Sequence, residues 1–224
     1  MSFPPKPPQP TSLLGYHRIL SPTAAIRVSP LCLGAMNFGS AWSSFMGECT
    51  KSTTFAILDT FHQQGGNFID TANMYQFGES ERWIGEWMAE RGNRDEIVLA
   101  TKFGSPTRYG DRMGSNFAGN SRKNLRLAVE GSLERLGTGY IDLLWVHAWD
   151  FTASVEEMMV CVFFPCDHRS VTDMALQNAL HQLVADGKVL YLGISDTPAW
   201  VVVKCNECEV CHKKRSDDQT CDTY

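Results

Sequence analysis

Short apolar segments alternate with segments of helical period along most of this chain, and this repeat limits the folds open to it. The apolar segments are residues 29–39, 67–72, 95–104, 140–150 and 188–196. The helical segments are residues 50–66, 78–93, 121–137, 154–159 with 176–187, and 197–207. The apolar segments are continuous runs, which are typical of strands that are buried on both faces. The alternation therefore predicts a parallel sheet with helices outside it.

Two architectures satisfy this pattern, a doubly wound sheet and a closed barrel. No Gly-x-Gly-x-x-Gly turn follows the first predicted strand, which argues against a doubly wound nucleotide-binding fold. Polar side chains follow the strands instead, at Asp70, Lys102, His147 and Ser195. A (β/α)8 barrel builds its active site from the carboxyl ends of its strands. We therefore expect an α/β fold of the (β/α)8 TIM-barrel type, preceded by a hairpin at residues 16–28.

Composition excludes several classes of protein. The 224 residues are 43% hydrophobic and 20% charged, with a net charge of −5, as in an ordinary globular protein without the basic surface that nucleic acids require. No apolar run approaches the ~20 residues that span a bilayer. The proline-rich residues 1–12 have no apolar signal core and predict a disordered tail. We therefore expect a cytoplasmic protein with no nucleic-acid or membrane partner.

The polar residues at the strand ends suit the reduction of a carbonyl group. That reaction needs a proton donor for the developing alkoxide and electrostatic stabilisation of the same oxygen. A tyrosine can donate the proton if an ammonium group stabilises its phenolate, and a carboxylate can hold that ammonium in place. A histidine can donate a hydrogen bond that orients the carbonyl. Tyr75, Lys102, Asp70 and His147 supply this set.

Each of these residues also has a purely structural interpretation. Asp70 alone could end a strand or cap a turn, Lys102 could be a solvated strand end, and His147 could be a structural histidine. Their occurrence together at successive strand ends favours catalysis, since barrel sites are assembled there. Trp83, Trp87 and Trp200 are interpreted as packing residues. Phe38, Trp42 and Trp149 are candidates for contact with an aromatic substrate, with simple packing as the alternative.

The segment NFIDTANMYQFGESE (67–81), a strand that ends in Thr-Lys (101–102) and a strand that ends in His147 together resemble the aldo-keto reductase pattern. By that resemblance Tyr75 is the general acid, Lys102 and Asp70 tune it, and His147 orients the carbonyl. The resemblance also implies NADP(H) as the cofactor. Asp70, Ser195 and Asp196 match positions that bind the cofactor, although many members have asparagine where this chain has Asp196.

The wording of RVSPLCLGAMNFG (27–39) and KVLYLGISDTPAWVVVK (188–204) resembles the fungal branch that contains aryl-alcohol dehydrogenases and norsolorinic acid reductase. This resemblance implies the reduction of an aromatic aldehyde or ketone, or the oxidation of an aryl alcohol. It also implies a role in fungal polyketide (mycotoxin) metabolism. The sequence leaves the oligomeric state open.

Two segments depart from the family pattern. Residues 160–175 (VCVFFPCDHRSVTDMA) interrupt a helix, and Pro165 cannot lie inside one; an aberrant insert and an ordinary surface insertion both explain them. The barrel would then span residues 13–207, with about five of the eight βα units that close such a fold. An open barrel exposes strand edges and apolar faces. We therefore expect an incomplete, poorly stable and inactive barrel, or a non-catalytic fragment that pairs with another protein.

Residues 208–224 form a cysteine-rich tail that has no counterpart in the family pattern. Cys208, Cys211 and His212 make a C-x-x-C-H motif, the attachment pattern of c-type haem. With Cys205 and Cys221 they could instead supply thiolate ligands to zinc. Haem attachment requires export and the zinc ligands are crowded into 17 residues. We therefore expect no metal and interpret the tail as a change of composition, with metal binding as the alternative.

Overall fold

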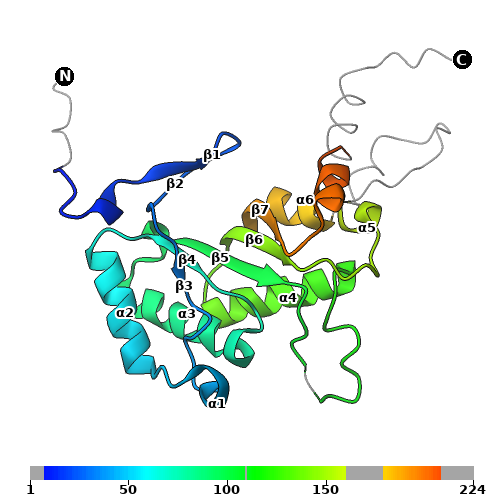
Figure 1. Cartoon of the computed structure of the whole chain (residues 1–224), viewed down its shortest axis with the longest axis horizontal. Coiled ribbons are helices and arrows are strands. Elements are labelled where there is room, and N and C mark those ends of the chain that lie inside the picture. Colours follow the sequence, from blue (N-terminus) through cyan, green and yellow to red (C-terminus); the bar gives the residue numbers. More distant parts are fainter. Residues whose placement is uncertain (1–7, 109, 160–178, 208–224) are drawn as a thin grey trace, which may run out of the picture. The chain divides into compact units, whose positions relative to one another are not determined.

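The computed structural model describes residues 8–108, 110–159 and 179–207 (Figure 1). The chain divides into two compact units, residues 1–100 and residues 101–224. Strands β3 to β7 follow one another in chain order in a five-stranded sheet. The strand pairs within each unit are parallel. This order, with helices in the connections, is the βα repeat that the sequence predicts.

The first unit contains a hairpin, three short strands of the sheet and their connecting helices. Its elements are η1 (Leu13–Gly15), β1 (Arg18–Ser21), β2 (Ala24–Val28), β3 (Leu33–Gly34), α1 (Ser43–Met46), α2 (Lys51–Gln63), β4 (Phe68–Asp70), η2 (Tyr75–Gly78), α3 (Glu79–Arg91), η3 (Arg94–Glu96) and the start of β5 (Val98–Phe103). Strands β1 and β2 pair antiparallel, which confirms the predicted hairpin.

Strand β3 is much shorter than the sequence suggests. Apolar residues 29–39 predicted a buried strand, but only Leu33 and Gly34 pair with β4. Leu31 is 65% exposed and Met36 is 39% exposed. The Ser29 hydroxyl donates to the Leu31 carbonyl oxygen at 2.7 Å, and such local bonds favour a turn over an extended strand. The prediction of a long buried strand here is therefore wrong.

Helix α2 begins one turn earlier than its predicted cap. The Thr50 hydroxyl accepts a hydrogen bond from the backbone N–H of Thr53, so Thr50 is the N-cap and Thr53 lies inside the helix. Helix α2 ends before Gly65, whose φ of 86° suits a residue without a Cβ. In α3, Ile84, Trp87 and Met88 are buried, as their helical spacing predicts.

The side chain of Asp59 joins helices α2 and α3. Its Oδ1 accepts hydrogen bonds from Trp87 Nε1 at 2.8 Å and from Arg91 Nε at 2.9 Å. The hydrogen bond from Arg91, followed by that from Trp87, outweighs desolvation and lowers the pKa of Asp59 to about 2. This pair therefore stabilises the folded first unit only while Asp59 is ionised.

The second unit contains the longest strands. Its elements are the end of β5, α4 (Arg122–Leu136), β6 (Ile141–His147), α5 (Val155–Met159), α6 (Ala179–Ala185) and β7 (Val189–Ser195), followed by helical residues 199–207. Ser121 caps α4 by accepting from the Asn124 N–H, and Gly137 ends it in a left-handed conformation. The predicted helix break at residues 160–175 lies outside the described residues.

Burial is uneven across the strands of the second unit. Every residue of β5 is buried, as a continuous apolar run predicts. On β7, Leu190 and Leu192 are each 41% exposed, which is the exposed apolar surface expected of an open sheet. Trp200 is 63% exposed, so its interpretation as a packing residue is wrong, whereas Trp87 is fully buried. No helix among the described residues is long and apolar enough to cross a bilayer.

Candidate active site

Asp70 and Tyr75 lie close together along the chain in the first unit. Asp70 is the last residue of β4, where its carbonyl oxygen accepts a hydrogen bond from Ala35 N at 2.9 Å. Tyr75 is the first residue of η2 and its side chain is half-buried. The indole of Trp42 meets the Tyr75 ring edge to face, with 6.4 Å between the ring centroids. Trp42 is therefore the one substrate-contact candidate that the structure puts beside Tyr75.

Gln76 fixes the loop that carries Trp42. Its side chain is fully buried; Oε1 accepts from Trp42 N at 2.7 Å and Nε2 donates to the Met36 carbonyl oxygen at 3.1 Å. Gln76 also has a φ of 52°, which is unusual for a residue with a Cβ. Glu79 supports the same loop by accepting hydrogen bonds from the backbone N–H of Ser40 at 2.7 Å. Sequence reasoning missed both residues, since nothing in their spacing indicates a contact 34 to 40 residues away.

Asn73 has an unmet demand for hydrogen bonds. It lies between Asp70 and Tyr75, is 2% exposed, and neither its Nδ2 nor its Oδ1 has a hydrogen-bond partner among the described residues. A buried amide without partners costs about 1–3 kcal/mol. Such groups are found at ligand-binding sites more often than in structural cores.

Lys102 and His147 belong to the second unit. Lys102 is the fifth residue of β5 and is 8% exposed, so it is not the solvated strand end of its structural interpretation. His147 is the last residue of β6 and Ser195 is the last residue of β7. The two are direct partners in the parallel register of β6 and β7. The structure therefore brings His147 and Ser195 together at the carboxyl ends of neighbouring strands.

The imidazole of His147 lies between two polar side chains. Ser105 Oγ is 3.4 Å from His147 Nδ1, and Asp196 Oδ2 is 4.0 Å from His147 Nε2. The Ser195 hydroxyl donates to the Val146 carbonyl oxygen at 3.2 Å, which leaves its oxygen able to accept. Asp196 has a φ of 46°, a conformation that aspartate and asparagine tolerate better than most residues.

Asn120 and Asp150 connect the loops that follow β5 and β6, and the sequence analysis did not single out either. Asn120 N donates to Asp150 Oδ2, and Asp150 N donates to Asn120 Oδ1, both at 2.8 Å. Burial raises the pKa of Asp150, but hydrogen bonds from the backbone of Thr152 and Asn120 outweigh it, and the net pKa is lowered. Asp150 is therefore an ionised acceptor at neutral pH.

Two other aromatic candidates are buried. Phe38 is 3% exposed and Trp149 is 7% exposed, so their structural interpretation as packing residues is favoured over substrate contact.

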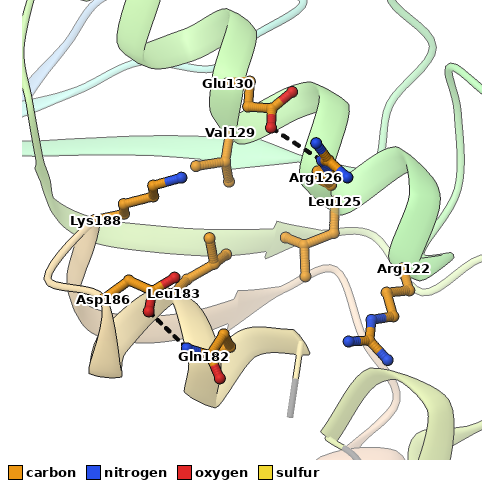
Figure 2. Close-up of a pocket in the computed structure, with 9 residues that line it drawn as sticks. All are labelled: Arg122, Leu125, Arg126, Val129, Glu130, Gln182, Leu183, Asp186 and Lys188. Atoms are coloured by element: carbon orange, nitrogen blue, oxygen red, sulfur yellow. Dashed lines mark hydrogen bonds and ion pairs between the residues drawn. The ribbon is translucent and has the colours of Figure 1, made fainter. Parts of the chain in front are cut away.

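A cavity of about 240 Å³ lies elsewhere in the second unit, between α4 and α6 (Figure 2). Its lining residues are Arg122, Leu125, Arg126, Val129, Glu130, Gln182, Leu183, Asp186 and Lys188. None of the predicted site residues is among them. Arg126 is already paired with Glu130 at 3.0 Å, and Gln182 donates to Asp186 at 2.6 Å. This groove between two outer helices is therefore distinct from the predicted site.

Comparison with known proteins identifies the family. The model of the aldo/keto reductase family matches residues 30–217, which is most of the chain. The chain belongs to the aldo/keto reductase family. Norsolorinic acid reductase A of Aspergillus parasiticus is 58% identical over 204 residues, 90% of this chain and 48% of that protein. An aryl-alcohol dehydrogenase of Pestalotiopsis microspora is 50% identical over 208 residues, 92% of this chain and 49% of that protein.

The fold comparison agrees with the family. An aldo-keto reductase from Bacillus halodurans, solved in its holo form, is 27% identical with a TM-score of 0.61, over 81% of this chain and 50% of that chain. The predicted barrel type is thus confirmed, with a five-stranded part of it described here. The chain spans about half the length of the curated relatives it matches. The C-x-x-C-H motif and the rest of the cysteine-rich tail lie outside the described residues.

Proposed function

We propose that this protein is an NADPH-dependent oxidoreductase of the cytosol that reduces an aromatic aldehyde or ketone, or oxidises an aryl alcohol. The observation that carries the proposal is the position of the polar residues: Asp70, His147 and Ser195 are each the last residue of a strand, and Lys102 is the last but one. Barrel enzymes place their reacting groups at these strand ends. Relatives named norsolorinic acid reductase and aryl-alcohol dehydrogenase support an aromatic substrate from fungal polyketide metabolism.

In this proposal Tyr75 donates the proton that the developing alkoxide takes up. The ammonium of Lys102 stabilises the phenolate that is left, and Asp70 keeps that ammonium charged and oriented. Lys102 is 8% exposed, and an ammonium in such a poorly hydrated environment acts strongly on a neighbouring charge. His147 donates a hydrogen bond to the carbonyl oxygen and so selects its orientation. The nicotinamide, when bound, supplies the hydride.

The acceptors near His147 fit the carboxamide of a nicotinamide. The Ser195 oxygen can accept a hydrogen bond while its hydroxyl donates to Val146, and the Asp196 carboxylate is 74% exposed and can accept as well. An amide NH2 offers two donors. Ser195 and Asp196 would therefore hold the amide nitrogen. The choice of NADPH over NADH rests on family resemblance.

NADPH titration and turnover of aryl aldehydes by the full chain test the proposal. Tyr75→Phe removes the proton donor, and we expect it to lower kcat about 100- to 10,000-fold with little change in the Kd of NADPH. Tyr16→Phe is the matched control, since Tyr16 is 49% exposed and hydrogen-bonds only Gln9 among the printed side-chain contacts of the first unit. Failure of the chain to bind NADPH, or equal turnover by Tyr75→Phe and the unchanged chain, would overturn the proposal.

A further inference from the structure

The backbone that follows His147 has an unusual conformation. Ala148 has a φ of 66° and Phe151 has a φ of 60°, both in the left-handed region that residues with a Cβ disfavour. Asp196, at the end of the neighbouring strand, has a φ of 46°. Strained backbone of this kind persists only where the surrounding structure over-determines it, and it clusters at functional sites. Some contact must therefore hold the loop that begins at Ala148.

Asn120 and Asp150, which we call the latch, hold this loop. Asn120 is 1% exposed, and its Nδ2 donates to the Ala148 carbonyl oxygen at 3.1 Å. The two 2.8 Å hydrogen bonds between Asn120 and Asp150 close a reciprocal pair. The Asp150 carboxylate also accepts from the backbone N–H of Thr152 at 2.9 Å and of Ala153 at 3.2 Å. The latch thus fixes residues 148–153 from both sides.

Gly104 allows the loop after β5 to approach the loop after β6 closely. A Cβ at Gly104 would lie 2.7 Å from the His147 carbonyl oxygen and 3.2 Å from Asn120 Nδ2. Gly104 also has a φ of 124° and accepts a hydrogen bond from Gly119 N at 2.6 Å. The backbone of His147 is therefore confined by Gly104 on one side and by the latch on the other.

Confinement of the His147 backbone determines what its imidazole meets. Nε2 is 4.0 Å from the Asp196 carboxylate, and a carboxylate can only accept a hydrogen bond. The neutral imidazole therefore favours the proton on Nε2. Nδ1 then accepts from Ser105 Oγ at 3.4 Å, since a hydroxyl can donate or accept. A rotated backbone at residue 148 would move the ring away from both partners.

We propose that the latch is a positioning device that holds the neutral imidazole of His147 with its proton on Nε2. Asn120 and Asp150 act through His147, and their effect on turnover rests on the proposed function of His147 as the hydrogen-bond donor to the carbonyl. The hydrogen bonds of the latch offset the strain at Ala148, which would otherwise relax out of the left-handed region.

Long-range ¹H–¹⁵N correlation of the imidazoles in the ¹⁵N-labelled full chain reports the tautomer directly, without cofactor or turnover. His147→Gln assigns the signal. In the unchanged chain we expect one Nε2–H pattern for His147 at neutral pH. Asn120→Ala should give averaged nitrogen shifts from mixed tautomers. Asn120→Ala combined with Ala148→Gly should restore the single pattern, because glycine adopts a φ near 66° without strain and the Ala148 N–H still bonds Ser195 O at 3.2 Å.

Asn67→Ala is the matched control. Asn67 is 8% exposed and its side chain makes two backbone hydrogen bonds, to Ser29 N at 2.7 Å and to Arg27 O at 3.0 Å, in the first unit. This variant loses the same number of buried bonds without touching the latch, so the His147 signals should not change. If Asn120→Ala does not fold, Asp150→Asn is measured instead, since it keeps the shape of the side chain but loses one acceptor.

The proposal is overturned if Asn120→Ala or its substitute keeps the single Nε2–H pattern, or if Ala148→Gly fails to restore it. With an active chain, Asn120→Ala should lower kcat about 10- to 100-fold, and Ala148→Gly should recover most of that loss. A latch-dependent tautomer in a chain without turnover would support the latch and overturn the proposed function. Turnover that does not change with the tautomer would overturn the catalytic consequence of the latch.

Discussion

Trp145 on β6 lies across Gly193 on β7, and the two are direct partners in the parallel register. A Cβ built on Gly193 would overlap the six-membered ring of the Trp145 indole. Glycine is therefore required at residue 193 to accommodate the ring, and Trp145 occupies the face of β6 that also carries His147, two residues further along the strand. The ring supports the candidate site from beneath.

Gly193→Ala should displace the Trp145 ring and lower the free energy of unfolding by about 1–3 kcal/mol, as overpacking of a closed core typically does. Urea unfolding followed by tryptophan fluorescence measures the change. Gly139→Ala is the control, because a Cβ there meets no atom within 4 Å. Equal stabilities for the two variants would contradict the packing described here.

Asn73→Leu should raise the free energy of unfolding by about 1–3 kcal/mol, because it replaces an unpartnered buried amide with an apolar side chain of similar size. Asn67→Leu serves as the comparison and should be destabilising, since Asn67 loses its bonds to Ser29 N and Arg27 O. Chemical denaturation of both variants decides between these signs. A destabilised Asn73→Leu would show that the amide finds a partner in solution.

Acid should remove the stabilisation that Asp59 provides. The pKa of Asp59 is about 2 in the folded chain and 3.8 in its absence of contacts. A lowered pKa in the folded state means that the stabilisation is complete above pH 3.8 and is lost as the pH falls towards 2. Unfolding midpoints of the unchanged chain and Asp59→Asn should thus differ at pH 6 and converge near pH 2. A constant difference over this range would argue against the pairing with Arg91.

Asp196→Asn should tighten the binding of NADPH about two- to tenfold, since asparagine can both donate to and accept from a carboxamide whereas Asp196 can only accept. The left-handed φ of 46° suits asparagine equally well. Fluorescence titration gives the Kd. Asp111→Asn, a change at an exposed acid of the same unit, should leave the Kd unchanged; weaker binding by Asp196→Asn would mean that the carboxylate itself is preferred.

The order of elements was predictable from the sequence because apolar period and breakers act locally. The hairpin at β1 and β2, the buried β5 and the apolar face of α3 all follow from such local patterns. The length of β3 did not, because it depends on a side-chain bond from Ser29 within a segment that is apolar throughout. Trp149 and Trp200 were misjudged because burial depends on which neighbours cover a residue, and neither is specified locally.

The residue types of the candidate site were predictable, but their supports were not. Motifs place Asp70, Tyr75, Lys102 and His147 at strand ends, and those assignments are still predictions of function. Gln76, Ser105 and Asn120 act through contacts that cross 34 to 42 residues of sequence, and their spacing carries no signal. Asp150 had a weak one, since an acid three residues after a strand-end histidine is a ready acceptor for loop amides.

The N-terminal segment has a different attachment from the rest of the first unit. Ser12 Oγ donates to Gln64 O at 2.6 Å and His17 Nε2 lies 2.8 Å from Gly65 O, while Leu13 is 82% exposed and Ile19 is 52% exposed. Polar links with little apolar burial open at low free energy. Amide hydrogens of residues 12–28 will therefore exchange with solvent through local opening, well before those of β5, and a protease will reach this stretch while the sheet behind it is still intact.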